Sequence, residues 1–563
     1  MSMNKFILFY HKIDSSFSFT LKRVKTCEDQ RNKENQAQLM NSSENESLNQ
    51  QDLSDENKQV MLVNDIMEKK VGFGWFQKRS LLILSCIDLN DGCEYIIISI
   101  VLPLIREEWN NKSLEQNPHQ HSDVINQNTF KWLTTIVFIG MFAGSIFTGY
   151  FSDRYGRKKV IMVCSLLYSI ACFYSLLITE IYEIFIQRFL QGLIFSVTIP
   201  LSTTMFTEIS PVKYRGMGVM FINFGITVGL LFGILLSWII LEDINHGKWR
   251  LLTAAQFIQG LVVFVGTYLY LLESPRYLML SNQVQEGVNV LNQMICINKQ
   301  IVQGDRASQQ DNKNLSQALV IQNENLITDQ QQIQLINLAK NINHDAGENL
   351  NMFAFLKKIE SLFNEKNKRL SIFLSLQYLF TGFIAFGQII TIPIIFQEQS
   401  KKSFLSLFVS FLGEIPSYLI FYFIFNREGA TRKKSMIISW FVSATFNILF
   451  YLRIYMSFSL FIVRMSQRCC YILQYLYCNE AYSTHLRTTG LGLMNMTARI
   501  GLIIMPFIVL EIVAYSPISS FLLFGLLCYL ISFFCYMLPF DTAKMRLDEQ
   551  SLLVQQDKNE NKI

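Results

Sequence analysis

The sequence predicts an all-α membrane protein with twelve transmembrane helices, arranged as two pseudo-symmetric bundles of six. Three observations predict this class. Half of the 563 residues are apolar and only 17% are charged, whereas an ordinary soluble domain has about 25% charged residues. Apolar segments of about 20 residues, the length that crosses a bilayer, recur along the chain. Two motifs also recur in the two halves at nearly the same offset.

The predicted spans fall into two sets of six, because in lipid a continuous helix satisfies every backbone polar group internally. The first set lies near residues 81–105, 130–151, 160–178, 181–205, 217–241 and 250–273. The second set lies near residues 370–396, 403–425, 435–453, 457–480, 488–513 and 516–539. The spans 160–178 and 435–453 are the weakest, since they are short and contain polar residues.

These spans divide the chain into five parts. The parts are a largely disordered N-terminal tail (1–78), a first bundle (79–276), a linker (277–369), a second bundle (370–540) and a C-terminal tail (541–563). The linker is rich in Asn and Gln, which predicts a disordered middle. A short amphipathic pattern opens the linker and another closes it. We expect the linker to act as a tether, or alternatively as a platform for a partner protein.

The Lys and Arg residues of the short loops predict the orientation of the chain in the membrane. The more basic side is cytoplasmic by the positive-inside rule, and with twelve spans both termini lie there too. Its basic residues are Arg154, Arg157, Lys158, Lys159, Lys213, Arg215, Arg427, Arg432, Lys433, Lys434 and Arg487. The sequon at Asn111 then lies in an outer loop, where it is a candidate for glycosylation.

Several function classes are excluded by what the sequence lacks. The net charge is only +5, and the basic residues form no stripe for nucleic acid. None of the eleven cysteines has CxxC spacing, so neither a disulfide framework nor a metal site is expected. There is no nucleotide-binding loop and no nucleophile elbow. The sequence therefore predicts no enzyme, no metal and no cofactor.

An internal repeat relates the two halves. Glu208 and Arg215 are seven residues apart just after the fourth predicted span. Glu480 and Arg487 have the same spacing after the tenth span, 272 residues later. A second motif, discussed next, recurs at an offset of 273 residues. Two motifs at nearly one offset indicate a parallel six-plus-six repeat, which is typical of transporters that rock two halves about a central site.

The second motif carries a resemblance to a known family. Residues 149–158 read Gly-Tyr-Phe-Ser-Asp-Arg-Tyr-Gly-Arg-Lys, and a related segment, 426–434, follows the eighth predicted span. The first segment resembles the signature loop between helices two and three of the major facilitator superfamily. The resemblance covers about residues 70–540 and implies a carrier whose helices one, four, seven and ten line a central cavity.

Further segments are similar to the synaptic vesicle protein-related and organic-ion transporter branch of that superfamily. They are Gly72–Gln77, Asp91–Glu94 with Leu102-Pro103 and Glu108-Trp109, Glu273–Tyr277, Glu414–Pro416, Arg487–Gly492, and Ala498–Gly501 with Pro506-Phe507. Two positions depart from the branch: Ser483 replaces a usual Pro, and Asn426 replaces an Asp. The seventh span lacks the paired Gln of sugar porters, since Tyr378 follows Gln377, so a sugar is the less favoured substrate.

The resemblance implies that charged residues at the cytoplasmic helix ends form gating salt bridges between helices. These signature and gating candidates are Gly149, Asp153, Arg154, Gly156, Arg157, Glu208, Arg215, Glu273, Arg276, Glu414, Glu480 and Arg487. Asp153 is expected to accept hydrogen bonds from a neighbouring helix N-terminus, where the helix dipole favours an anion. Arg154 and Arg157 are expected to pair with carboxylates of other helix ends. The alternative is plain positive-inside anchoring.

Charged residues inside the predicted spans are the candidates for the transport site, because an unpaired charge in the membrane is costly. The candidates for the cavity are Asp91, Glu94, Arg188, Gln388, Arg464 and Arg499. Asp88, Asp91 and Glu94 follow at three-residue steps along one ridge of a helix, which suits a proton or cation site. Asp88 is expected to be hydrated. The alternative is that Asp91 and Glu94 only neutralise Arg188.

Aromatic residues could complete an amphipathic pocket, although each also suits plain packing. They are Tyr378, Phe383, Phe386, Tyr475 and Tyr477.

Together these features predict a monomeric secondary active carrier of a small organic solute, working by alternating access. Asp91 and Glu94 are the candidates for coupling to H⁺ or another ion. The membrane is the plasma membrane or a vesicle membrane, and no nucleic-acid partner is expected. The alternatives are a non-transporting receptor or trafficking protein on a carrier scaffold and, with less support, a sugar porter.

Overall fold

The computed structural model describes most of the chain between residues 62 and 542. The described ranges are 62–116, 126–241, 247–281, 283–307, 360–397, 403–421, 423, 431–482 and 484–542. Within these ranges the regular elements are helices, with one isolated bridge between Leu241 and Gly247. The helices discussed below belong to one compact unit, formed by Ile66–Thr328 and Glu348–Ile563. The predictions for residues 1–61, for residues 543–563 and for residues 308–359 of the linker lie outside the described residues, whereas the described residues 62–71 of the N-terminal tail are helical.

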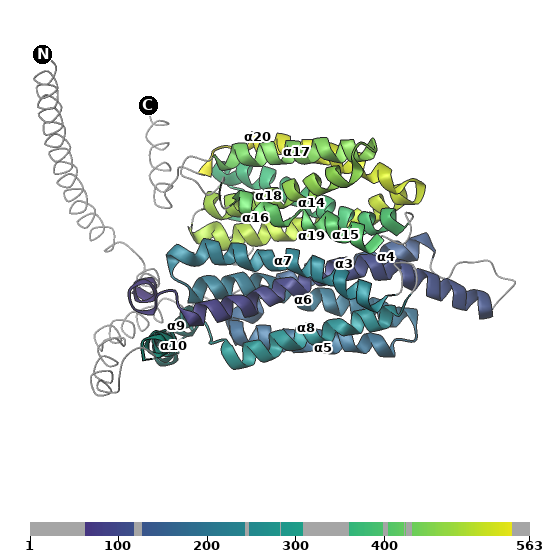
Figure 1. The fold of residues 1–563 in the computed structure, drawn as a ribbon. Coiled ribbons are helices and arrows are strands. Elements are labelled where there is room, and N and C mark those ends of the chain that lie inside the picture. Colours follow the sequence, from purple (N-terminus) through teal and green to yellow (C-terminus); the bar gives the residue numbers. More distant parts are fainter. Residues whose placement is uncertain are drawn as a thin grey trace, which may run out of the picture. The chain divides into compact units, whose positions relative to one another are not determined.

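Six helices coincide with the first six predicted spans and form the first half (Figure 1). They are α3 (Trp75–Gln116), α4 (Gln127–Tyr155), α5 (Arg157–Tyr174), α6 (Ile181–Ile209), α7 (Val212–Ile240) and α8 (Trp249–Tyr270). Local sequence sets their ends. Asn126 accepts a hydrogen bond of 2.9 Å from the Thr129 amide at the start of α4, as an N-cap residue does. Gly156, at φ 95°, makes the sharp turn into α5.

Among its described residues, the second half contains seven α-helices in place of the six predicted spans. They are α14 (Glu365–Gln397), α15 (Ser403–Leu412), α16 (Ile415–Ile420), α17 (Arg432–Tyr451), α18 (Met456–Ala481), α19 (Thr484–Tyr515) and α20 (Ser520–Met537). The predicted single span 403–425 is interrupted between α15 and α16. Pro416 lies at the start of α16, where a missing amide is tolerated, and Glu414 lies at the interruption.

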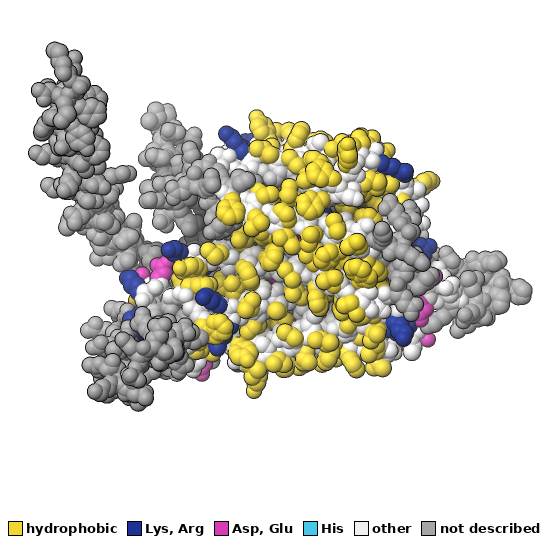
Figure 2. Space-filling model, viewed as in Figure 1, with side chains coloured by type: hydrophobic (Ala, Val, Ile, Leu, Met, Phe, Trp, Pro, Cys, Tyr) yellow, Lys and Arg dark blue, Asp and Glu magenta, His cyan; other side chains and the backbone are white. Residues whose placement is uncertain are grey.

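Eight of the described helices are long and apolar enough to cross a membrane by length and composition alone. The predicted spans outside this set correspond to α3, the α15–α16 pair, α17 and α18. Helices α3 and α18 carry charged residues in their middle, and those charges are the site candidates. Figure 2 shows hydrophobic side chains over the centre of the visible face and charged ones mainly toward its left and right ends. Ile239 is 81% exposed, as a lipid-facing side chain would be.

The two halves repeat one packing scheme. In the first half α3 packs on α7, α4 on α6, and α5 on α8. In the second half α14 packs on α19, α15 and α16 on α18, and α17 on α20. Across the interface, α4 contacts α19 and α7 contacts α15. In the repeat, α4 corresponds to the α15–α16 pair and α7 corresponds to α19, so these two contacts are equivalent. The predicted duplication is therefore visible in the helix contacts as well as in the motifs.

Glycines allow the closest helix pairs to approach. A Cβ on Gly229 of α7 would lie 2.0 Å from the Leu89 carbonyl oxygen of α3, and one on Gly501 of α19 would lie 2.0 Å from that of Leu379 in α14. The α3–α7 and α14–α19 pairs are equivalent in the repeat. Small residues that let backbones approach are typical of helix packing in membranes.

The amphipathic pattern that opens the linker forms a helix, α10 (Val284–Ala307), preceded by the short helix α9 (Pro275–Leu280). Its apolar side chains Val288, Leu291 and Met294 are buried, so this face packs against the protein. Asn298 of α10 accepts a 2.9 Å hydrogen bond from the Phe76 amide and donates one of 3.0 Å to the Val71 carbonyl. The start of the linker is therefore anchored to the start of α3.

Candidate functional site

The signature residues form a network at one end of the first half, called here the signature end. Arg157, the first residue of α5, lies 3.2 Å from both Asp153 and Glu208. Glu273 accepts hydrogen bonds of 3.0 and 3.1 Å from the amides of Arg157 and Lys158. A carboxylate at a helix N-terminus is stabilised by these amides and by the helix dipole. This network joins the ends of α4, α5, α6 and α8.

Two expectations for this end are wrong in detail. The carboxylate at the N-terminus of α5 belongs to Glu273, while Asp153 pairs with Arg157 one turn away. Among the described residues Arg154 pairs with no carboxylate; its guanidinium donates to the Tyr150 hydroxyl and lies 5.6 Å from the Tyr155 ring. The reason is geometric, since Arg154 is on the exposed face of α4. A Cβ on Gly149 would meet nothing within 4 Å.

The remaining first-half candidates at this end are also engaged. Gly156 is confined, because a Cβ there would lie 2.5 Å from a Glu273 oxygen. Arg215 donates a 3.2 Å hydrogen bond to the Ser210 carbonyl.

The second half repeats the signature network with different residues. Arg432, which begins α17, lies 3.7 Å from Glu480, and its amide donates a 3.0 Å hydrogen bond to Asp541. Thr542 donates a 2.6 Å hydrogen bond to Glu480. Arg432 and Glu480 thus match Arg157 and Glu208, and Asp541 matches Glu273. Asp541 is absent from the sequence-based candidates, although its position in the repeat is the signal that would have found it. The Arg487 side chain lies outside the described side chains.

Inside the first half, Glu94 of α3 and Arg188 of α6 form a buried ion pair. Their oxygen and nitrogen atoms are 2.6 Å apart, and the side chains are 0% and 2% exposed. Tyr168 donates a 3.3 Å hydrogen bond to the other Glu94 oxygen, and Arg188 also donates to Gln191 at 3.3 Å. In this conformation Glu94 therefore neutralises Arg188, which is the alternative that the sequence left open.

Among the described residues of the first half, neither Asp91 nor Asp88 forms an ion pair with an Arg or Lys side chain. Asp91 is 3% exposed, and its Oδ1 atom accepts no hydrogen bond from the described residues. Tyr95, one helical turn after Asp91 on α3, contacts Arg499 of α19 across the interface. Asp88 is 1% exposed and accepts a 3.0 Å hydrogen bond from Ser202. The expectation that Asp88 is hydrated is wrong in this structure, because α6 covers it.

In the second half, Glu414 is the centre of a buried cluster. It pairs with Arg464 and lies 3.6 Å from Arg468, both of α18. It also accepts a 2.7 Å hydrogen bond from Thr227 of the first half. The sequence prediction placed Glu414 among the gates and missed Arg468. The signal for Arg468 was present, since it lies one helical turn after Arg464 in the same predicted span.

Arg468 and Arg499 both reach across the interface. Arg468 donates hydrogen bonds of 2.8 Å to the Tyr418 hydroxyl and 3.0 Å to the Asn223 carbonyl of α7. Arg499 donates a 3.0 Å hydrogen bond to the hydroxyl of Tyr95 in α3. Both guanidinium groups therefore face first-half helices.

The cavity prediction for Gln388 is wrong. Its amide donates a 2.9 Å hydrogen bond to Asn447 of α17, so the side chain is turned into the second half. Tyr477 is also turned away, because its hydroxyl bonds the Phe540 carbonyl at 2.8 Å. Both lie on faces of their helices that pack on neighbouring helices, which residue type alone does not reveal.

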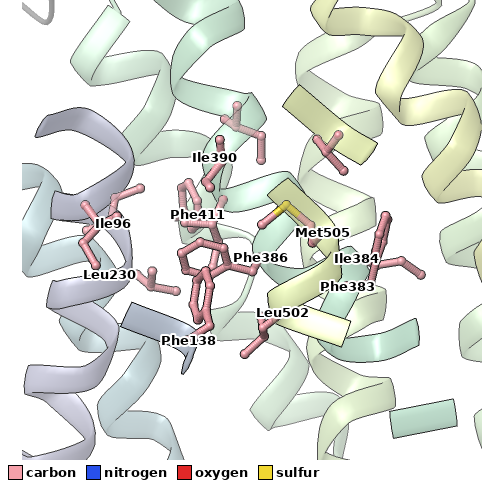
Figure 3. Packing of buried hydrophobic residues seen from close by; sticks show 14 of the residues in the cluster. Ile96, Phe138, Leu230, Phe383, Ile384, Phe386, Ile390, Phe411, Leu502 and Met505 are labelled. Atoms are coloured by element: carbon pink, nitrogen blue, oxygen red, sulfur yellow. The ribbon is translucent and has the colours of Figure 1, made fainter. Parts of the chain in front are cut away.

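Apolar side chains of both halves meet beyond the charged residues, on the side away from the signature end (Figure 3). The Phe386 ring lies 4.5 Å from that of Phe138 and 5.3 Å from that of Tyr95, both edge-on. Figure 3 shows Ile96 and Leu230 of the first half and Phe411 and Leu502 of the second in the same cluster.

Nearer the end opposite the signature network, further contacts join the halves. Lys131 of α4 pairs with Glu511 of α19, and Trp132 lies edge-on to Phe507 with ring centroids 5.2 Å apart. In the part of the chain that the structure describes, the hydrogen bonds, ion pairs and ring contacts between the halves thus cluster from the charged centre toward this end. Among the described residues, no three His, Cys, Asp or Glu side chains are grouped as metal ligands would be.

Comparisons with known proteins agree with this architecture. A family model described as "Sugar (and other) transporter" matches residues 88–342. The chain is 25% identical over 523 residues to the "Synaptic vesicle 2-related protein" of Rattus norvegicus, covering 87% of this chain and 83% of that protein. It is 23% identical over 498 residues to the "Organic cation/carnitine transporter 7" of Arabidopsis thaliana, covering 84% and 93%.

Solved structures show the same fold. The inward-open xylose transporter XylE from E. coli has a TM-score of 0.60 and 16% identity, with 84% of this chain and 98% of that chain covered. The proton:xylose symporter XylE bound to a bromodeoxyglucose has a TM-score of 0.61 and 17% identity, with 85% and 99% covered. At this identity the likeness concerns the fold.

The fold and the charged interior define the class, a multi-pass membrane transporter. The chain is similar to the synaptic vesicle 2-related proteins, its residues 88–342 match the family of sugar and other transporters, and its fold is that of the solved XylE structures. The family and its named relatives are transporters rather than enzymes, in agreement with the prediction from the sequence.

Proposed function

We propose that this protein is a secondary active transporter that moves a small organic solute by alternating access. The observation that carries the proposal is the buried Asp91 of α3, one helical turn before Tyr95, whose hydroxyl accepts a 3.0 Å hydrogen bond from Arg499 of α19. These two charges belong to different halves and lie where the halves meet. Charged groups inside a membrane bundle are costly and mark solute or ion pathways. Relatives named as transporters support the same proposal.

The arrangement of contacts suggests how the halves move. Within each half, the signature networks around Arg157 and Arg432 tie helix ends together, so each half would move as a rigid body. Between the halves, the aromatic cluster of Phe386 and the Lys131–Glu511 pair hold the end opposite the signature networks together. By the positive-inside rule we place the signature end and both termini in the cytoplasm. The structure then represents a conformation closed toward the outside.

Asp91 is the better candidate for ion coupling than Glu94. Glu94 is held by Arg188 and Tyr168, whereas one oxygen of Asp91 is without a hydrogen-bond donor. Release of a proton from Asp91 would create a buried anion that attracts Arg499 and so draws the halves together. A solved structure with this fold is that of a proton:xylose symporter, which supports proton coupling through Asp91. Glu94 would instead keep Arg188 in place.

Uptake into proteoliposomes tests the proposal. Organic cations, anions, zwitterions and sugars would be offered with and without an inward pH gradient. We expect at least one solute to accumulate against its gradient, and Asp91→Asn to remove the dependence on the pH gradient. Glu286→Gln, an exposed carboxylate on α10, is the matched control. Equal pH dependence in Asp91→Asn and the unmodified protein would contradict the coupling role, and no uptake of any solute would favour the receptor alternative.

A further inference from the structure

Two of the buried charge groups are already neutralised within their own half. Glu94 pairs with Arg188 in the first half, and Glu414 pairs with Arg464 in the second. Both pairs are almost completely buried. A solute would have to break such a pair to use its charges, which leaves an uncompensated charge and is strongly unfavourable. These pairs therefore hold neighbouring helices together around the site and do not bind the solute.

The charges that remain have opposite signs on opposite halves. The first half contributes Asp88 and Asp91, both from α3 and both buried. The second half contributes Arg468 and Arg499, which donate hydrogen bonds to neutral groups, namely the hydroxyls of Tyr418 and Tyr95 and the Asn223 carbonyl. Arg468 shares Glu414 with Arg464 at 3.6 Å, so that carboxylate serves two cations. One wall of the interface thus has two negative groups and the other has two positive ones.

Hydrogen bonds and packing place the basic groups beside the acidic stretch of α3. Arg499 donates to the hydroxyl of Tyr95, one helical turn after Asp91. Arg468 donates to the Asn223 carbonyl of α7, and a Cβ on Gly225, two residues further on, would lie 3.3 Å from the Asp88 side chain. The Arg468 guanidinium also lies 5.5 Å from the ring centroid of Tyr471 in α18. The site therefore has an acidic wall, a basic wall and an aromatic ring between them.

This distribution selects the charge type of the solute. A cation would satisfy the acidic wall, leaving Arg499 without an anion and Arg468 with only the carboxylate that it shares with Arg464. An anion would leave Asp88 and Asp91 without a cation. Guanidinium groups bind carboxylates through paired hydrogen bonds. Carboxylates and the face of a tyrosine ring attract ammonium groups. A solute with both groups satisfies both walls at once.

We propose that the transported solute is zwitterionic, with a cationic nitrogen held by Asp88 and Asp91 and an acid group held by Arg468 and Arg499. This inference rests on the proposed transport function. In the empty protein, Asp91 and Arg499 attract each other across the interface. The solute replaces that attraction with one bond to each half and so brings the halves together without adding net charge.

A matched set of three probes tests the inference. The first is an N-trimethylated ω-amino acid, offered as a series with two to six methylene groups. The second is its methyl ester, which is only a cation. The third has carbon in place of the nitrogen and is only an anion. Uptake into proteoliposomes and the rise in melting temperature of the purified protein would be measured for each. We expect at least one zwitterion to be taken up at least tenfold better than both of its partners.

Charge-removing variants give a second readout that a merely structural role would not produce. Asp91→Asn should lose preference for the zwitterion over the anion, and Arg499→Gln should lose preference for the zwitterion over the cation. Glu286→Gln, at an exposed position of α10, should change neither. Equal loss of all three probes in both variants would overturn the assignment. If a single-charge probe or a sugar is transported as well as the zwitterion, transport stands and the zwitterion inference fails. If nothing is transported or bound, the proposed function itself fails.

Discussion

The hydroxyl of Thr227 in α7 donates a hydrogen bond of 2.7 Å to Glu414, the buried carboxylate at the break between α15 and α16. One side chain of the first half is thereby tied to the ion cluster of the second. The Tyr418 hydroxyl adds a 3.0 Å hydrogen bond to the Asn223 carbonyl, one helical turn before Thr227. These contacts make the α7–α16 crossing a polar joint between two otherwise apolar surfaces, and the variants below test it and the rest of the site.

Removing the Thr227 hydroxyl should weaken the joint. Thr227→Val keeps the shape of the side chain and deprives Glu414 of one donor, which we expect to cost about 1–3 kcal/mol because the acceptor is buried. The measurement is the melting temperature of the purified protein in detergent. Thr204→Val is the control, since its hydroxyl bonds only its own helix at an exposed position. Equal melting temperatures for the two variants would contradict the joint.

The Glu94–Arg188 pair should behave as a unit. Glu94→Gln leaves the Arg188 guanidinium buried without an anion, and loss of one partner of such a pair typically costs about 3–5 kcal/mol. The double variant Glu94→Gln with Arg188→Met removes both charges and should regain much of the lost stability. The check is a double-mutant cycle on thermal unfolding. Additive effects of the two substitutions would show that the side chains are not coupled.

Substitution by alanine should lower the melting temperature at one glycine of the first half and leave it unchanged at another. Gly229→Ala places a methyl group 2.0 Å from the Leu89 carbonyl, so α3 and α7 must separate and the melting temperature should fall by several degrees. Gly149→Ala meets open space and should leave the melting temperature unchanged. If Gly149→Ala nonetheless slows transport, that glycine is packed in another conformation of the cycle. A melting temperature lowered by Gly149→Ala would refute the packing described here.

The Lys131–Glu511 pair should report on opening of the end opposite the signature networks. Lys131→Glu and Glu511→Lys each place like charges together, and the double charge swap should restore the interaction. Glu511 is 56% exposed, and exposed pairs contribute about 0.2–1 kcal/mol, so we expect changes in uptake rate of at most about fivefold. High salt should reduce them. A double swap that behaves worse than either single variant would contradict a direct pair.

Much of this fold follows from the sequence, for identifiable reasons. The apolar runs define helices because lipid permits little else, and the Glu208–Arg215 and Glu480–Arg487 repeat predicts the pairing of halves that the helix contacts confirm. The rule that charges inside a membrane need partners correctly singled out Glu94 and Arg188. The break in the eighth span was missed, because Gly413 and Pro416 are also compatible with a continuous transmembrane helix.

The site was harder to predict than the fold, because it depends on the rotation of each helix about its axis. Gln388 and Phe386 are two residues apart in α14, yet Gln388 contacts α17 while Phe386 contacts the first half. Arg188 and Arg464 are equivalent in the repeat, yet their acids come from helices that are not equivalent, α3 and the α15–α16 break. Neither the orientation of Gln388 and Phe386 nor the acidic partners of the two arginines can be derived from the composition of the chain or from the spacing of its motifs.

Paired distances across the two ends test the central claim that the halves rock about a charged centre. One label pair would be placed at the exposed residues Lys213 and Lys434 near the signature end, and another at the exposed Thr179 and Tyr515 near the opposite end. Pulsed electron resonance would measure both distances with and without a transported solute. The account predicts that one distance lengthens when the other shortens. If transported solutes leave both distances unchanged, or move both in the same direction, alternating access by rocking halves is wrong for this protein.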